Sequence, residues 1–188
     1  MRRRKTVYAA AILSVAAFFS FTTDEKIAWS ADHKLTWSDF KGKHNIPPPQ
    51  DALTNSDISL TTVNTTNDSI RLQIICYFNP LKSSATTKPK SDKLLRHEQG
   101  HFDLTEIYAR LLRKKLSEAK VSGKSATSEV TAIYKKNFAE CQKEQKKYDK
   151  ETKHSLIEDK QKERNADIEK RLKESEKYNF HFLTLKYK

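Results

Sequence analysis

Two histidines separated by three residues give this chain its clearest chemical signature. His97, Glu98 and His101 form an H-E-x-x-H pattern, inside a stretch whose apolar residues recur every three or four positions. Residues four apart lie on one side of a helix, so both imidazoles can reach one zinc ion at about 2.0–2.1 Å. Glu98 is then placed to act as general base toward a water at that site. The alternative is a surface helix whose histidines are merely solvated.

A hydrolytic zinc site usually has three protein ligands and one open position, so a third ligand is expected elsewhere. The densest candidate cluster is the segment 148–154, which contains Asp149, Glu151 and His154. We favour His154 as the third metal ligand, with Glu151 and Asp149 as alternatives. Tyr148 is expected to hydrogen-bond a developing oxyanion, or instead simply to pack against the helix that carries the histidines.

Three further charged residues lie near the motif. Asp103 is expected to accept a hydrogen bond from a ligand imidazole and so to set its tautomer, or else to be an ordinary exposed helical carboxylate. Arg96 and Arg110 are interpreted as charges on the helix surface, or else as partners of a carboxylate near the site.

The elements that must position these residues begin with strands. The alternation of Leu35, Trp37 and Phe40 predicts a first strand or strand-turn within Lys34–Gly42. The stretch Asp57–Asn79 is rich in Thr, Ile and Val and is interrupted by the turn residues Asn67-Asp68-Ser69, which predicts a β-hairpin.

Helices are expected to follow the hairpin. The pattern predicts one helix over about 92–119, capped by Ser91 or Asp92, and a second that begins near Thr127. Residues 142–177 carry 12 Lys or Arg and 10 Asp or Glu, which is typical of solvated helices. Aromatic residues return over Tyr178–Tyr187, which indicates a final strand or a terminal segment that docks on the domain. The expected fold class is α+β: a small N-terminal antiparallel sheet, the H-E-x-x-H helix, and long C-terminal helices.

The N-terminus has the features of an export signal. Four basic residues, at positions 2–5, precede an uncharged run from Thr6 to Thr23 with an apolar centre. We expect residues 1–23 to be a cleaved signal peptide, with a retained membrane anchor through residues 6–23 as the alternative. The remaining residues, 24–188, are expected to form one domain in the periplasm or outside the cell. Export into an oxidising compartment makes Cys76 and Cys141 a candidate disulfide, the alternative being two buried thiols.

Composition narrows the function classes. The 188 residues carry a formal charge of +12, which by itself suggests a nucleic acid or an anionic surface as partner. Part of this charge belongs to the export signal, and the charged helical region is nearly balanced. The chain has only 3 glycines, which argues against a glycine-rich phosphate-binding turn. We therefore expect no nucleic-acid partner, while contact with the cell envelope fits the remaining positive charge.

Four segments resemble a known bacterial family. They are LTWSDFKG at 35–42, LLRHEQGHFD at 94–103, EIYARLLRKKL at 106–116 and YDKETKH at 148–154. These segments are similar to domain-of-unknown-function family nine-two-two, which is grouped with zinc-dependent proteases of the zincin-like clan. The resemblance implies His97, His101 and His154 as zinc ligands and Glu98 as catalytic base. The chain departs from the family pattern at Ser155, where a glycine usually follows the last histidine.

The residues and the resemblance together predict an exported zinc metallohydrolase, with a peptide or protein as substrate and a zincin-like fold. The alternative from a different class is a non-catalytic envelope protein with a structural zinc site that binds a protein or envelope partner.

Overall fold

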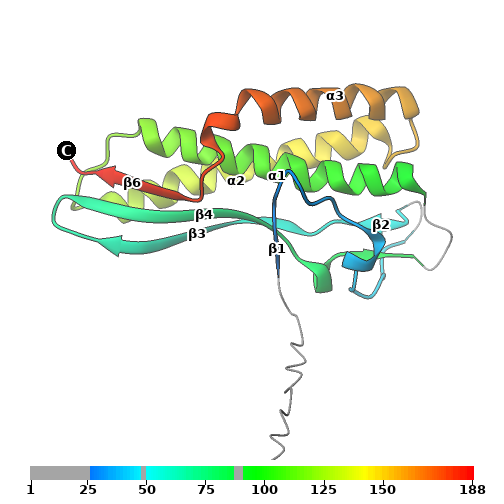
Figure 1. The fold of residues 1–188 in the computed structure, drawn as a ribbon, viewed down its shortest axis with the longest axis horizontal. Coiled ribbons are helices and arrows are strands. Elements are labelled where there is room, and N and C mark those ends of the chain that lie inside the picture. The colour runs from blue at the N-terminus through cyan, green and yellow to red at the C-terminus, as the bar shows by residue number, and fades with distance from the viewer. Residues whose placement is uncertain (1–25, 48–49, 87–90) are drawn as a thin grey trace, which may run out of the picture.

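A computed structural model describes residues 26–47, 50–86 and 91–188. A four-stranded antiparallel sheet lies on one side of the molecule, and three helices lie on the other (Figure 1). The α+β fold class is therefore confirmed. The proposed signal peptide or anchor, residues 1–23, lies outside the described residues. Within the described ranges, no helix is both long and apolar enough to cross a membrane.

The sheet is built around one hairpin. Strand β3 (Ser56–Thr65) pairs with β4 (Ser69–Phe78) in antiparallel register, with Ile58 opposite Cys76. The predicted hairpin over 57–79 is confirmed. Successive side chains of a strand point to opposite faces of the sheet. The side chains that face the helices are therefore buried, and in β4 they are mostly apolar.

The other edge of β4 is shared by the two ends of the described chain. β1 (Ile27–Ala28) pairs with the end of β4, and β6 (Phe182–Lys186) pairs with its beginning. The final strand predicted within 178–187 is confirmed. The sequence suggested an N-terminal sheet. The sheet also includes β6, which comes from the C-terminal end of the chain. Two very short strands, β2 (Ala52–Leu53) and β5 (Ser84–Ala85), pair separately.

The strand predicted within Lys34–Gly42 is wrong. Trp37–Asp39 form a single 3-10 turn. The main-chain N–H of Thr36 donates to Asp39 Oδ2 at 2.7 Å, and the Thr36 hydroxyl donates to the same oxygen at 2.9 Å. Such local side-chain bonds to the backbone compete with strand pairing, and apolar alternation alone does not reveal them.

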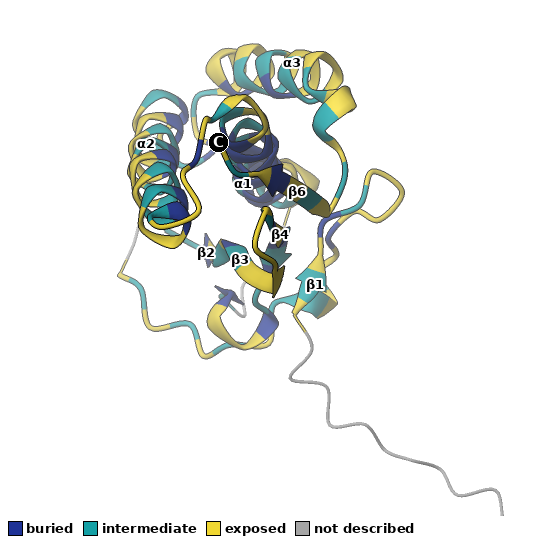
Figure 2. Cartoon of the chain, turned by 90° about the vertical axis from the view of Figure 1, so that its left-hand side faces the viewer, coloured by how far each residue is buried: buried dark blue, intermediate teal, exposed yellow. Residues whose placement is uncertain are grey.

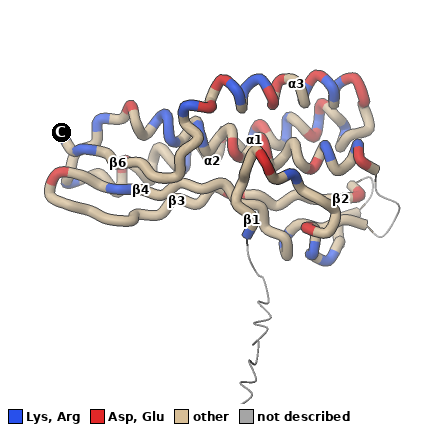
Figure 3. The backbone as a smooth tube through the Cα atoms, in the orientation of Figure 1, with Lys and Arg blue, Asp and Glu red and all other residues tan. Residues whose placement is uncertain are grey.

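Three helices lie on one face of the sheet (Figure 1). They are α1 (Asp92–Glu118), α2 (Ala126–Thr152) and α3 (Glu158–Glu174). The hydroxyl of Ser91 accepts a hydrogen bond from the Leu94 N–H and caps α1, as predicted. The charged region 142–177 forms the end of α2 and α3, and charges of both signs follow α3 along its length (Figure 3).

Helix α1 is the centre of the molecule. It lies between the sheet on one side and α2 and α3 on the other, and it is buried along most of its length (Figure 2). Apolar side chains fill the space between α1 and the sheet: Ile58, Ile70, Leu72, Ile74, Phe78, Phe102, Ala109, Leu112 and Leu116. A smaller cluster joins α1 to α2 and α3 and consists of Leu104, Ile107, Tyr148 and Ile168.

Many of the side chains that α1 buries are polar. Glu106, Arg110 and Arg113 are called the ion cluster below. In it, Glu106 Oε1 lies 2.9 Å from both Arg110 Nε and Arg113 Nη1. The guanidinium groups also donate to main-chain carbonyls of Leu172 (2.7 Å) and Ile74 (3.0 Å). The interpretation of Arg110 as a surface charge is wrong. It is fully buried because its partners come from distant segments that fold over α1.

The predicted disulfide is also wrong. Cys76 and Cys141 are both buried and both free. The Cys76 thiol lies 3.9 Å from the main-chain oxygen of Phe102, and burial raises the pKa of Cys141 to about 12. The two residues act as small apolar groups of the core, as the alternative reading had them.

Candidate metal centre

Three side chains bring potential ligand atoms together between α1 and α2. His97 Nε2 lies 3.2 Å from His101 Nε2, and Asp149 Oδ1 lies 3.2 Å from the first and 2.9 Å from the second. All three atoms are within 4.8 Å of one another. Ligands bound tetrahedrally to zinc at 2.0–2.1 Å are about 3.3–3.4 Å apart, so the spacing fits a zinc-sized ion. These residues are called the metal group below.

Both imidazoles are held in the tautomer that a metal requires. His97 Nδ1 lies 2.9 Å from Gln161 Oε1, and His101 Nδ1 lies 2.6 Å from Gln145 Oε1. An amide oxygen only accepts, so each Nδ1 carries the proton and donates it. Each Nε2 is therefore left to ligate an ion, and without an ion it can take a proton and donate to Asp149 Oδ1. Such outer partners commonly orient ligand histidines.

Tyr148 supports the two imidazoles from behind. Its ring stacks on His97 with centroids 4.7 Å apart and meets the His101 ring edge-on at 4.9 Å. Its hydroxyl donates to the main-chain oxygen of His97 at 3.2 Å and accepts from Gln161 Nε2 at 2.6 Å. The ring is fully buried and does not line the adjacent pocket. These contacts favour the packing reading of Tyr148 over a role with an oxyanion.

The approach of Tyr148 depends on a residue without a side chain. A Cβ at Gly100 would overlap the Tyr148 hydroxyl and lie 2.9 Å from its Cζ. The tyrosine is rigid and fully buried, so it could not move aside cheaply. The glycine inside the H-E-x-x-H pattern is thus required by the packing of α2 on α1.

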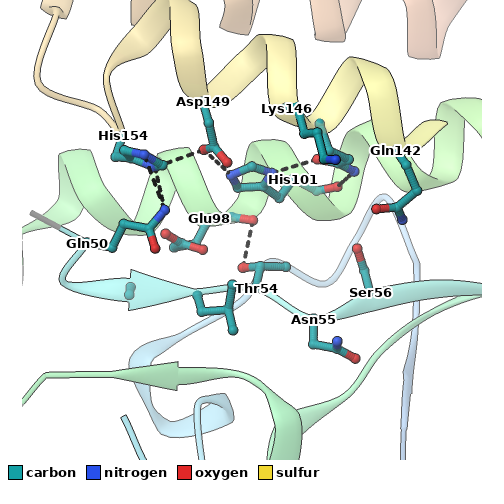
Figure 4. A pocket seen from close by; sticks show the side chains of 13 residues that line it. Gln50, Thr54, Asn55, Ser56, Glu98, His101, Gln142, Lys146, Asp149 and His154 are labelled. Atoms are coloured by element: carbon teal, nitrogen blue, oxygen red, sulfur yellow. Dashed lines mark hydrogen bonds and ion pairs between the residues drawn. The ribbon is translucent and has the colours of Figure 1, made fainter. Parts of the chain in front are cut away.

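Glu98 is buried beside the metal group. Its Oε2 has no hydrogen-bond partner among the described residues, although a buried carboxylate oxygen normally has one. Its main-chain oxygen accepts from the Thr54 hydroxyl at 3.1 Å, which ties this turn of α1 to the segment after β2. Figure 4 shows the Glu98 side chain in the pocket, on the side of Gln50. An unpaired buried oxygen at this place fits a group that exchanges protons with a bound molecule.

His154 reaches the metal group through Asp149. Its Nδ1 lies 3.1 Å from Asp149 Oδ1, and its Nε2 lies 3.2 Å from Gln50 Nε2 (Figure 4). Helix α2 ends at Thr152, and the next three residues all have positive φ, at 47°, 53° and 72°. Ser155, the last of them, thus holds a conformation that only glycine adopts without strain.

The electrostatics favour a charged pair within this cluster. Burial by itself would raise the pKa of Asp149, but hydrogen bonds from His101 and His97 lower it well below its ordinary range. Burial acts to lower the pKa of His101, yet the hydrogen bond to Asp149 and the charge of Glu98 raise it overall. In the absence of metal, a proton on His101 therefore substitutes for part of a cation's charge.

A cavity of about 230 Å³ opens beside the metal group. Figure 4 shows α1 behind it, α2 along one side, and the segment from β2 to β3 along the other. Its lining residues are Gln50, Ala52, Leu53, Thr54, Asn55, Ser56, Glu98, His101, Gln142, Gln145, Lys146, Asp149 and His154. Most of these are polar, so the cavity suits a polar ligand.

Other predicted residues lie away from the metal group. The carboxylate of Glu151 is 3.8 Å from Lys147 Nζ and 3.6 Å from Arg164 Nε, and Glu151 does not belong to the group. Arg96 is exposed, as expected.

The role predicted for Asp103 is wrong. Its Oδ1 accepts from Trp29 Nε1 at 2.7 Å and from Gln99 Nε2 at 2.8 Å. Asp103 is on the back of α1, where it anchors the N-terminal segment instead of an imidazole.

Sequence reasoning missed the two glutamines that orient the ligands. Gln145 precedes Asp149 by four residues, so helical spacing could have placed it on the same face. Gln161 comes from α3, and no local pattern links it to His97.

The comparisons with known proteins agree with the resemblance and add no activity. No curated protein and no solved structure matches the chain. Residues 81–155 match the model of the family described as "Bacterial protein of unknown function (DUF922)". The matched range includes His97, His101, Asp149 and His154. This match supports placing the chain with that uncharacterised bacterial family.

Proposed function

We propose that the protein is an exported zinc-dependent metallohydrolase that cleaves peptides or proteins. The observation that carries the proposal is the convergence of His97 Nε2, His101 Nε2 and Asp149 Oδ1, with the unpaired Oε2 of Glu98 at the same cavity. Three protein ligands beside an open space are typical of a catalytic zinc site, whereas structural sites are closed by four.

In this proposal each residue has one task. His97, His101 and Asp149 hold the ion, and His154 is the other candidate third ligand, in contact with Asp149. When bound, zinc would supply Lewis acidity to a water and to a substrate carbonyl. Glu98 accepts the proton of the attacking water and delivers it to the leaving amine. Gln145, Gln161 and Tyr148 keep the imidazoles in place.

The decisive experiment compares the wild-type chain with Glu98→Gln. We expect wild type to bind about one zinc per chain at neutral pH and to cleave members of a mixed peptide library. Glu98→Gln should retain zinc but lose at least about 100-fold in cleavage rate, as general bases contribute roughly 10²–10⁴-fold. Glu118→Gln, an exposed change near the end of the same helix, is the matched control. No zinc in wild type, or full activity in Glu98→Gln, would contradict the proposal.

A second candidate function has one observation in its favour. His154 Nδ1 lies 3.1 Å from Asp149 Oδ1, so a small movement could make it a fourth ligand and close the site. The protein would then be a non-catalytic envelope protein with a structural zinc. X-ray absorption of the zinc-loaded protein separates the two: four protein ligands, with one lost in His154→Ala, favour the structural role.

A further inference from the structure

The cavity beside the metal group has a second half that the proposed chemistry does not use. Gln142 and Lys146 project over it from α2, one helical turn apart, while Asn55 and Ser56 lie on the opposite side (Figure 4). Of the described residues that line the cavity, Lys146 alone is a lysine or arginine.

Both α2 side chains are free to receive a ligand. Lys146 makes no ion pair with any described carboxylate, unlike its neighbour Lys147, which lies 3.8 Å from Glu151. The Gln142 amide likewise has no hydrogen bond within the described part of the chain. Lys146 offers three N–H donors and a positive charge, and Gln142 adds two amide N–H donors. Two such donors four residues apart on one helix face match the two oxygens of a carboxylate.

The opposite wall contributes less, because its groups are already engaged. The Ser56 hydroxyl is 2.6 Å from Thr105 Oγ1, and Asn55 Oδ1 accepts from Asn79 Nδ2 at 2.8 Å. These residues therefore shape the cavity, whereas Lys146 determines which charge on a ligand is preferred there. The carboxylates in the cavity, Glu98 and Asp149, both belong to the metal-site end.

The spacing relates this end of the cavity to the metal group. Lys146 precedes Asp149 by three residues, which is about 4.5 Å along a helix axis. A substrate whose reacting carbonyl lay at the metal group would thus present its neighbouring residue to Lys146. An acidic group there would be attracted, and a basic group would be repelled.

We propose that Lys146 and Gln142 form a carboxylate-binding subsite, and that the preferred substrate carries a carboxylate next to the bond to be cleaved. This inference rests on the proposed function, because the bond to be cleaved is taken to lie at the metal group. The carboxylate can belong to an Asp or Glu side chain or to the free C-terminus of a peptide. Lys146 is a specificity-determining residue in either case.

The test measures binding by calorimetry, on full-length protein carrying Glu98→Gln so that no probe is consumed. The probes are capped pentapeptides of alanine with glutamate, glutamine or lysine at the centre, and a penta-alanine with a free C-terminal carboxylate. Each is titrated with and without zinc. We expect the carboxylate probes to bind roughly five- to tenfold more tightly than the glutamine probe, with the difference shrinking at high salt.

Two substitutions separate the subsite from general charge effects. Lys146→Gln should remove the preference for carboxylate probes while leaving the glutamine probe unaffected. Lys147→Gln changes the net charge equally but lies outside the cavity, so it should leave the preference intact. Tighter binding of the glutamate probe alone assigns the carboxylate to a side chain; tighter binding of the free penta-alanine alone assigns it to a C-terminus.

Failure of the subsite and failure of the proposed function give different results. If carboxylate probes bind no better than the glutamine probe, or if Lys146→Gln and Lys147→Gln behave alike, the subsite is wrong, whatever wild type cleaves. If the preference depends on Lys146 but wild type binds no zinc and cleaves nothing, the subsite stands as a binding site and the metallohydrolase proposal is wrong.

Discussion

Helix α1 carries two buried polar clusters that differ in their access to a cavity. In the ion cluster, one carboxylate oxygen of Glu106 serves two guanidinium groups, which also bind main-chain carbonyls. In the metal group, imidazole nitrogens and a carboxylate oxygen converge beside a cavity, and Glu98 Oε2 has no described partner. Arg110 Nη2 and Arg113 Nε have no hydrogen-bond partner among the described residues either, so neither cluster is fully bonded. The clusters differ in access, because Glu98, His101 and Asp149 line the cavity and the residues of the ion cluster do not. In the proposed function, burial of charge on one helix therefore serves structure at one place and ligand binding at the other.

The two clusters should respond oppositely to substitution. Removing one partner of a buried ion pair leaves an uncompensated charge and destabilises strongly. Removing a ligand of an open site mainly costs metal affinity. The following predictions test this contrast, from the largest expected effect to the smallest.

Glu106→Gln should cost about 3–5 kcal/mol of unfolding free energy, because Arg110 and Arg113 would lose their shared anion inside the core. Zinc affinity of the folded protein should stay within about twofold. Denaturant unfolding measures the first quantity and zinc titration the second, with Glu118→Gln as the exposed control. A loss below about 1 kcal/mol would mean that the ion cluster is not structurally important.

Asp149→Asn should weaken zinc binding by more than about 100-fold, equivalent to about 2.7 kcal/mol, since it removes an anionic ligand of the metal group. His154→Asn should weaken it by less than about tenfold, because His154 contacts the group through Asp149. Competition titrations with a chelator measure both constants. The reverse order would make His154 the third ligand, as the sequence favoured.

Gln161→Met should weaken zinc binding by roughly 10–100-fold, because it removes the acceptor that holds the His97 tautomer. Gln161→Glu retains an acceptor oxygen at the same place and should recover most of the affinity. Equal loss in both variants would show that the contact matters for packing and not for orienting the imidazole.

A third polar cluster, between α2 and α3, should show the smallest effect and a pH dependence. Burial by itself raises the pKa of Glu144, but the hydrogen bond from Arg164 and the charges of Arg164 and Arg171 lower it below its ordinary value of 4.5. A carboxyl whose pKa is lower in the folded state stabilises the protein at any pH above its unfolded-state pKa. This stabilisation is lost as the pH falls through the folded-state pKa. Glu144→Gln should thus cost about 1 kcal/mol at pH 7.

The difference between wild type and Glu144→Gln should shrink as the pH falls below 4.5. Denaturant unfolding over a pH series measures it, with Glu169→Gln as an exposed control on α3. A difference that grows toward low pH would have the wrong sign.

The sequence predicted whatever depends on regular spacing. Helical periodicity placed His97 and His101 on one side of α1, and alternation located the β3–β4 hairpin. Regular spacing does not decide among Asp149, Glu151 and His154 as the third ligand. Helix α2 ends at Thr152, and the positive φ values after it set where His154 lies.

Long-range partners explain the errors at Arg110 and Asp103. Arg110 is expected on the helix surface, yet it is buried, and its acceptor, the main-chain oxygen of Leu172, comes 62 residues later. Asp103 was assigned to an imidazole because it follows His101 closely, but it faces the opposite side of α1, where Trp29 reaches it. No local pattern contains the information that two distant segments meet on one helix.

Gly100 has a consequence for recognising such sites in other genomes. The usual consensus allows any residue at the fourth position of the motif, but here a methyl group would collide with the ring behind the imidazoles. A search pattern that demands glycine there, together with a tyrosine on a later helix, would select chains with the same close helix packing. It would discard unrelated helices that carry two histidines by coincidence.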